Sequence, residues 1–107
     1  MNQSELTASG LKKEDVIAIQ NIFKMYPKIS KAILYGSRAK GNYRPGSDID
    51  LTLQGDQLDY TDLVSIDNAL DDLLLPYTID LSIYHQIENT DLIDHIKRVG
   101  QAFYSKA

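Results

Sequence analysis

The sequence predicts an α/β (α+β) domain in which a small mixed β-sheet has helices packed on one face. Two observations predict this fold class. Apolar residues recur at three- and four-residue spacing in some segments and at every second residue in others, the periods of helices and strands. The segments follow as helix, strand, strand, helix, strand, helix, an order that suits one sheet with a helical layer. We expect a single domain over residues 1–107, with a polar, flexible stretch at residues 1–10.

The first half of the chain predicts one helix and two strands. Residues 12–25 carry an apolar stripe that includes Val16, Ile19 and Phe23, and the helix ends before Pro27. The run "KAILYG" at residues 31–36 is short, apolar and bounded by a glycine, which is typical of a strand. The run "DIDLTLQG" at residues 48–55 alternates between polar and apolar side chains, so one face of this strand enters the core. The loop that joins the two strands allows an antiparallel pair, which makes the sheet mixed.

The second half predicts a crossover helix, a third strand and a last helix. Residues 61–74 repeat apolar side chains along one face, and this helix is long enough to connect parallel strands. The run "YTIDLSIY" at residues 77–84 alternates again. A helix follows at residues 91–99, with Thr90 as its cap and Gly100 at its end. The run "QAFYSK" suits either a short final strand or a docked tail.

Composition excludes several classes of function. The chain lacks cysteine and has only two histidines, which excludes thiolate chemistry and histidine-rich metal sites but leaves carboxylate sites open. The formal net charge of −4 argues against general nucleic-acid binding. No apolar run approaches the roughly 20 residues of a membrane span, so we expect no membrane partner. The first 15 residues lack the apolar core of a signal peptide, which predicts a cytoplasmic protein.

Three carboxylates are the first candidate site residues. Asp48 and Asp50 lie two apart in a predicted strand, so their side chains leave the same face. Asp80 has the same position in the next strand, and the three converge if those strands are neighbours. Carboxylates held so close repel one another unless a cation compensates them. Mg²⁺ prefers such oxygen ligands, and two ions can clamp a phosphoryl group during in-line displacement.

The loop in front of these acids looks suited to an anion. Gly36 lets a phosphate approach the backbone closely, and Ser37 is placed to cap a short helical turn and to donate a hydrogen bond. Arg38 and Arg44 can neutralise the negative charge of a triphosphate. Taken alone, these residues would also suit a tight capped turn with no ligand.

The whole arrangement resembles the nucleotidyltransferases of the DNA polymerase β superfamily. The pattern reads Gly36-Ser37, ten residues, then Asp48-x-Asp50, followed by Asp80 in a later strand. The phrase "GSRAKGNYRPGSDIDL" is most similar to the minimal nucleotidyltransferase (MNT) family, whose small members are antitoxins of HEPN-domain toxins. The resemblance implies a polymerase β-like nucleotidyltransferase fold. It also implies ATP as cosubstrate, two Mg²⁺ ions on Asp48, Asp50 and Asp80, and phosphate binding at Gly36 and Ser37.

The same resemblance implies a function, with alternatives. It predicts transfer of AMP from ATP to a hydroxyl, that of a tyrosine, on a HEPN-type toxin partner, which silences the toxin. A second interpretation is an antitoxin that neutralises its partner by binding alone. A third is nucleotidyl transfer to a small molecule such as an aminoglycoside, although such enzymes usually carry an additional helical domain. Base preference, stoichiometry and the choice between homo- and hetero-oligomer stay open in the sequence.

Overall fold

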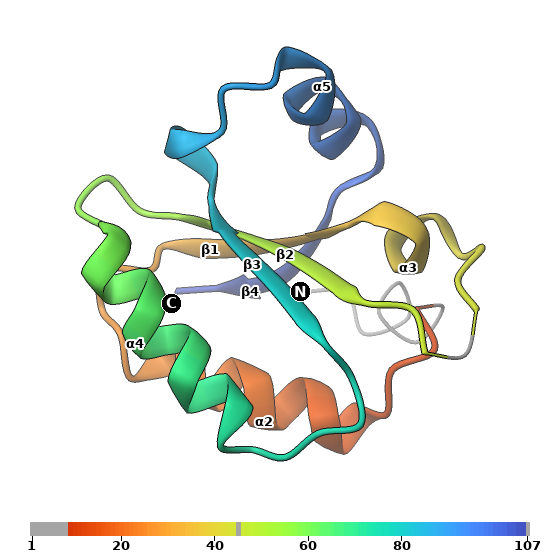
Figure 1. The fold of residues 1–107 in the computed structure, drawn as a ribbon, viewed down its shortest axis with the longest axis horizontal. Helices are drawn as coiled ribbons and strands as arrows, with labels where there is room; N and C mark the ends of the chain where they lie inside the picture. The colour runs from red at the N-terminus through yellow and green to blue at the C-terminus, as the bar shows by residue number, and fades with distance from the viewer. Residues whose placement is uncertain (1–8, 45, 107) are drawn as a thin grey trace.

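The computed structural model describes residues 9–44 and 46–106, and it contains the predicted mixed sheet (Figure 1). The strands are β1 (Lys31–Tyr35), β2 (Ile49–Gln54), β3 (Ile79–Ile83) and β4 (Gln101–Ser105). Their order across the sheet is β3-β2-β1-β4. Strand β1 pairs antiparallel with β2 and with β4, while β2 and β3 run parallel. The fold class expected from the sequence is therefore confirmed, and "QAFYSK" supplies a fourth strand.

The helices fall within a few residues of their predicted bounds. They are α2 (Lys13–Lys24), α3 (Gly36–Lys40), α4 (Tyr60–Asp71) and α5 (Thr90–Val99), with a 3₁₀ turn η1 (Tyr84–Gln86) after β3. The cap of α5 differs from the prediction: the Asn89 side chain, not that of Thr90, accepts the amides of Asp91 and Leu92. Most of the expected flexible stretch, residues 1–8, lies outside the described residues. Within the described part of the chain, no helix has the length and apolarity to cross a bilayer.

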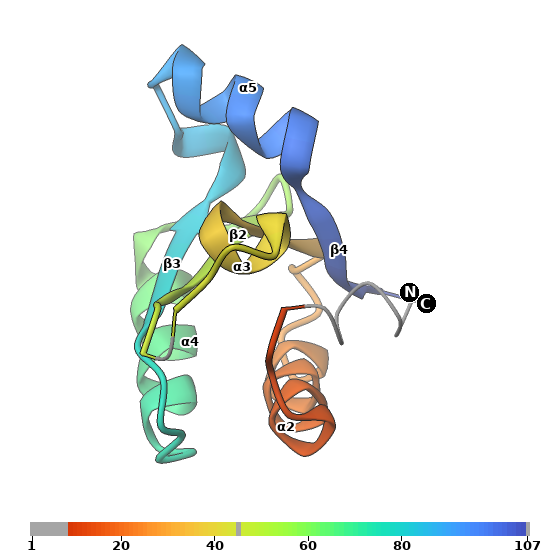
Figure 2. The same cartoon turned by 90° about the vertical axis from the view of Figure 1, so that its right-hand side faces the viewer.

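Helices α2 and α4 form the predicted layer on one face of the sheet, and α5 lies on the opposite side (Figure 2). The core lies between the sheet and this layer. From β2, Ile49, Leu51 and Leu53 point into it and are fully buried. Phe23 of α2 and Ile66 of α4 close it from the helical side. The alternation of β2 therefore works as the sequence predicts, with apolar side chains on the helical face and polar ones opposite.

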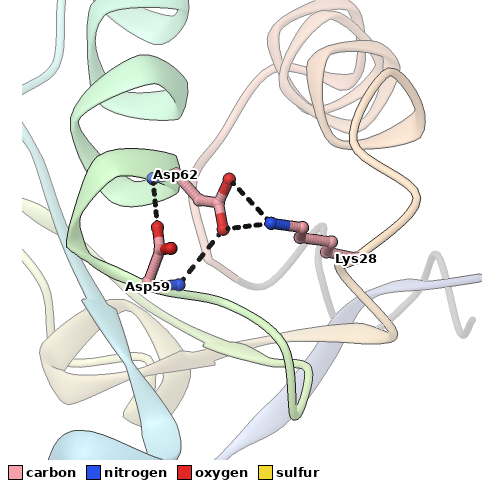
Figure 3. Close-up of polar contacts among 3 residues, drawn as sticks. All are labelled: Lys28, Asp59 and Asp62. Atoms are coloured by element: carbon pink, nitrogen blue, oxygen red, sulfur yellow. Dashed lines mark hydrogen bonds and ion pairs between the residues drawn. The ribbon is translucent and has the colours of Figure 1, made fainter.

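A network of two aspartates and a lysine fixes the start of α4 (Figure 3). The Asp59 carboxylate accepts the Asp62 amide at 2.9 Å, and the Asp62 carboxylate accepts the Asp59 amide at 3.1 Å, which makes a reciprocal capping box. Lys28, from the segment between α2 and β1, lies 3.1 Å from the Asp62 carboxylate. The crossover helix is thus tied at its first turn to the chain before β1.

Candidate active site

The parallel pairing of β2 and β3 brings two of the predicted acids face to face. In the register of the sheet, Asp50 lies directly opposite Asp80, and Leu51 lies opposite Leu81. Asp50 also lies opposite Tyr35 at the end of β1. Residues that face each other across a sheet share one side of it, so Tyr35, Asp50 and Asp80 lie on the side away from α2 and α4. Asp48 is exposed and stands just before β2.

The electrostatics of this side are those of an uncompensated anionic site. Burial raises the pKa of Asp50 above its usual value, and the neighbouring Asp80 and Asp48 carboxylates raise it further. Burial also raises the pKa of the Tyr35 hydroxyl, the Asp50 and Asp80 charges act in the same direction, and Ser82 opposes them. The acids therefore hold more negative charge than their surroundings stabilise, which is the condition that a bound cation relieves.

The Gly36-Ser37 turn lies against this acid pair. Gly36 has a φ of +75°, a conformation that L side chains rarely adopt, and a Cβ there would overlap with Oδ2 of Asp50. Helix α3 begins at Gly36, so the expectation that Ser37 caps it is wrong: the cap position is Tyr35, with no side-chain hydrogen bond. Glycine is therefore required for two reasons, backbone geometry and the close approach of a carboxylate.

The two arginines of the loop have different surroundings. Arg38 is 3% exposed, and its guanidinium donates to the backbone oxygens of Ser47 and Ser9 at 3.1 and 2.9 Å. The same group lies between the rings of Tyr43 and Tyr77, 4.9 and 5.1 Å from their centroids. These contacts give Arg38 a structural role in holding the loop and lend no support to its predicted contact with an anion.

Arg44, in contrast, is exposed. Its amide donates to the Ser47 hydroxyl at 2.8 Å, and its carbonyl accepts from the Ser47 amide. The loop backbone is thereby fixed at Arg44 while the exposed side chain stays available. A role of this arginine in neutralising a phosphate stays a prediction.

Sequence reasoning missed one residue of this site, His95. The residue comes from α5, and its Nε2 accepts the Gly36 amide at 3.2 Å. Its ring packs edge-on against Tyr35, with 6.2 Å between the ring centroids. His95 is 59 positions from Gly36 in the chain, and only the packing of α5 against α3 brings the two together. No local pattern in the sequence indicates this contact.

Two further features adjoin the acids. The Thr52 hydroxyl is fully buried on the acid side of β2 and has no hydrogen-bond partner among the described residues. Beside the outer edge of β3, Asp80 helps to line a groove of about 240 Å³ together with Tyr60 and Val64 of α4, which are 72% and 39% exposed. Asp80 thus lies in a groove that holds a second acid, Asp67, and exposed apolar side chains.

The chemistry of the donor set fits Mg²⁺, which prefers carboxylate oxygens. Within residues 9–44 and 46–106, no three acidic or histidine side chains are already gathered tightly enough to hold a metal. Mg²⁺ commonly takes one or two protein carboxylates and completes its shell with water and substrate phosphates. Asp50 and Asp80, which are paired in register, are the residues that would hold such an ion, and the predicted third ligand, Asp48, is exposed just before β2.

Three solved structures share this fold. A toxin–antitoxin with AMP-PNP has a TM-score of 0.69 and 22% identity, with 90% of this chain and 75% of that chain covered. The MntA–HepT toxin–antitoxin has a TM-score of 0.67, 18% identity and coverage of 89% and 74%. A tri-AMPylated Shewanella oneidensis HEPN toxin in complex with MNT antitoxin has a TM-score of 0.60, 20% identity and coverage of 86% and 73%. At these identities the likeness establishes the fold alone.

A family model supplies what the distant structures do not. A search of curated proteins found no match. The model described as polymerase beta, nucleotidyltransferase, matches residues 18–107, a span that includes the glycine turn, the three acids and His95. This match confirms the nucleotidyltransferase that the sequence pattern predicts. The chain therefore belongs to the polymerase beta nucleotidyltransferase family.

Proposed function

We propose that this protein transfers AMP from ATP to a hydroxyl group, that of a tyrosine, on a HEPN-type toxin, and so acts as an antitoxin. The observation that carries the chemistry is the pairing of Asp50 with Asp80 beside the Gly36 turn in a chain of this family. Support for the biological role comes from the structural neighbours, which are toxin–antitoxin assemblies, one with AMP-PNP and one with an AMPylated HEPN toxin.

In this proposal the residues of the site have two roles, binding of the nucleotide and activation of the acceptor hydroxyl. Asp48 and Asp50 would hold Mg²⁺ with the nucleotide, and Asp80 would hold the metal at the acceptor hydroxyl. When bound, Mg²⁺ lowers the pKa of that hydroxyl and balances charge on the departing pyrophosphate. Gly36 and Ser37 bind the phosphate tail, with Arg44 at the rim. Asp80 sits at the edge of the sheet, next to the groove that Tyr60 and Val64 line.

The exposed apolar side chains of the groove support a protein acceptor. Tyr60 and Val64 expose apolar surface in the groove that Asp67 and Asp80 also line, and exposed apolar side chains gathered in this way are typical of a contact with another protein. A partner protein can also supply the second wall that a domain of this size does not build. We therefore place the toxin's acceptor segment at the β3 edge and the nucleotide at the Gly36 end.

The test is a transfer assay with a defined partner. The purified chain is incubated with Mg²⁺, ATP labelled at the α-phosphate and the HEPN-type protein encoded beside it or, if there is none, the Shewanella oneidensis HEPN toxin. We expect pyrophosphate release and a rise in the toxin's intact mass by whole adenylates. EDTA and Asp50→Asn should each abolish both signals.

Two outcomes would overturn the proposal in different ways. Unmodified toxin that is nevertheless inhibited, equally by wild type and by Asp50→Asn, would show neutralisation by binding alone. Label transferred to an aminoglycoside in the absence of any partner protein would show a small-molecule enzyme.

A further inference from the structure

We infer that His95 is a positioning residue for the nucleotide, one that holds the Gly36 amide in the nucleotide-free protein and donates to a phosphate oxygen once nucleotide is bound. The inference rests on the proposed nucleotide site and adds a residue to it from α5. No part of the Gly-Ser or aspartate pattern contains this residue.

The first step is the hydrogen bond itself. Gly36 N–H donates to Nε2 of His95 at 3.2 Å. Nε2 must be unprotonated to accept, so in this state the imidazole is neutral and carries its proton on Nδ1. The edge-on contact with Tyr35, at an interplanar angle of 80°, restricts the orientation of the ring. The ring is therefore an ordered partner of the amide and not a chance surface contact.

The second step is steric. A phosphate oxygen that accepts from Gly36 N–H would occupy the place that Nε2 occupies now, because an N–H donates along one direction. The imidazole must then give up the amide. Its α5 backbone packs against α3, so the ring stays beside the turn and Nε2 remains within reach of the arriving oxygen.

The third step is the exchange of roles. Once the amide binds phosphate, an unprotonated Nε2 would face an anion with its lone pair, which is repulsive. The neutral ring avoids this by releasing its proton from Nδ1 to water while Nε2 takes one up, which leaves its net charge unchanged. Nε2–H then donates to the phosphate oxygen. The hydrogen bond lost at Gly36 is replaced by one in which the acceptor is charged.

Two substitutions distinguish the contribution of the Nε2 hydrogen bond from that of ring packing at His95. His95→Phe keeps a flat ring against Tyr35 but removes Nε2, and His95→Gln removes the ring but keeps an acceptor and a donor at similar reach. We expect His95→Phe to raise the KM for ATP about three- to tenfold, because it removes the excess of a hydrogen bond to a charged acceptor over the neutral one that it replaces, with little change in kcat. His95→Gln should recover most of this loss. His85→Phe is the matched control, because His85 is the other histidine and is exposed in η1.

A measurement without catalysis completes the test. We would record the ¹⁵N resonances of the His95 imidazole and the Gly36 amide during titration of the wild-type protein with AMP-PNP and Mg²⁺. We expect Nε2 to change from an unprotonated to a protonated nitrogen while the Gly36 amide shifts. If the Ser37 and Gly36 amides shift but Nε2 stays unprotonated, or if His95→Phe leaves the KM unchanged, the inference about His95 is wrong and the nucleotide site stands. If no resonance of the turn responds to nucleotide, both the inference and the proposed function fail.

Discussion

The molecule contains two groups of aspartates in opposite circumstances, the pair Asp59 and Asp62 at the start of α4 and the site acids Asp48, Asp50 and Asp80. Each carboxylate of the first pair accepts a backbone amide, and Lys28 adds a cation (Figure 3). Those hydrogen bonds lower the pKa of Asp62, with the side chain of Lys28 as the largest cause. The carboxylates of the site acids accept no hydrogen bond from the described residues, and the pKa of Asp50 is raised.

The difference separates structural from functional carboxylates by their partners. Asp59 and Asp62 are satisfied by the chain itself, so they stabilise the fold. The site acids are placed by the sheet but left without compensating charge, so they cost stability until a ligand supplies it. Four predictions test this comparison, and the largest expected effect comes first.

Asp50→Asn should reduce AMP transfer by more than about 100-fold, because it removes a charge at the reacting centre. The free energy of unfolding without nucleotide should be unchanged or higher, since repulsion with Asp80 is relieved. Transfer of labelled AMP and urea denaturation measure the two quantities. Asp62→Asn is the opposite control, with normal transfer and lower stability. Normal transfer by Asp50→Asn would contradict the assignment of the site.

Gly36→Ala should lower both stability and nucleotide binding. Gly41→Ala is its control, because both glycines have positive φ but a Cβ at Gly41 meets no atom within 4 Å. Backbone strain alone costs about 1–2 kcal/mol at either position. Gly36→Ala adds an overlap with Asp50, so it should unfold at lower urea and show no calorimetric binding of AMP-PNP with Mg²⁺. If the two variants have the same stability and the same affinity for AMP-PNP, the contact between Gly36 and the Asp50 carboxylate does not explain the need for glycine.

Asp59→Ala should lower the free energy of unfolding by about 1 kcal/mol, the usual value of an N-cap side chain. Asp56→Ala, at an exposed position of the preceding turn, should change it by no more than about 0.5 kcal/mol. Urea denaturation at neutral pH measures both. A loss as large for Asp56→Ala would mean that net charge, and not the cap, governs this region.

The smallest effect is a pH dependence of opposite sign in the two groups. The folded pKa of Asp62 lies below its unfolded value, so its stabilisation is present above the unfolded pKa and is lost as pH falls through the folded one. The folded pKa of Asp50 lies above its unfolded value, so its destabilisation develops as pH rises through these values. Denaturation between pH 7 and about pH 3 should show Asp62→Asn below and Asp50→Asn above wild type, with both differences shrinking toward acid pH. If both variants were more stable than wild type, or both less stable, the contrast between the two groups of aspartates would be wrong.

The sequence predicts the parts of the molecule that local patterns determine. The alternation of residues 48–55 and 77–84 predicts which side chains face the core, and the parallel register then places Asp80 opposite Asp50. Apolar periodicity and the prolines predict the helices to within a few residues. Both patterns depend on residues that are close together in the chain, so they can be recognised from the sequence alone.

Tertiary contacts account for what the sequence did not predict. The loop sequence favours an anion-binding role for Arg38, and the structure adds that its guanidinium lies against the rings of Tyr43 and Tyr77. His95 looks like a helix-surface histidine until α5 packs over the side of the sheet that carries the acids. In both cases a residue distant in sequence sets the role, Tyr77 for Arg38 and Gly36 for His95, and no spacing rule encodes either contact.

The parallel pairing of β2 and β3 has a consequence for the order of folding. Residues 36–48, which include α3, join β1 to β2, whereas the longer segment 55–78 joins β2 to β3, so β3 reaches β2 only after α4 has crossed over the sheet. Asp50 and Asp80 thus belong to a non-local contact that closes late. A newly made chain can therefore pair β1 with β2 before it holds a working centre, so we expect catalytic competence to appear only after α4 and β3 have docked on the sheet.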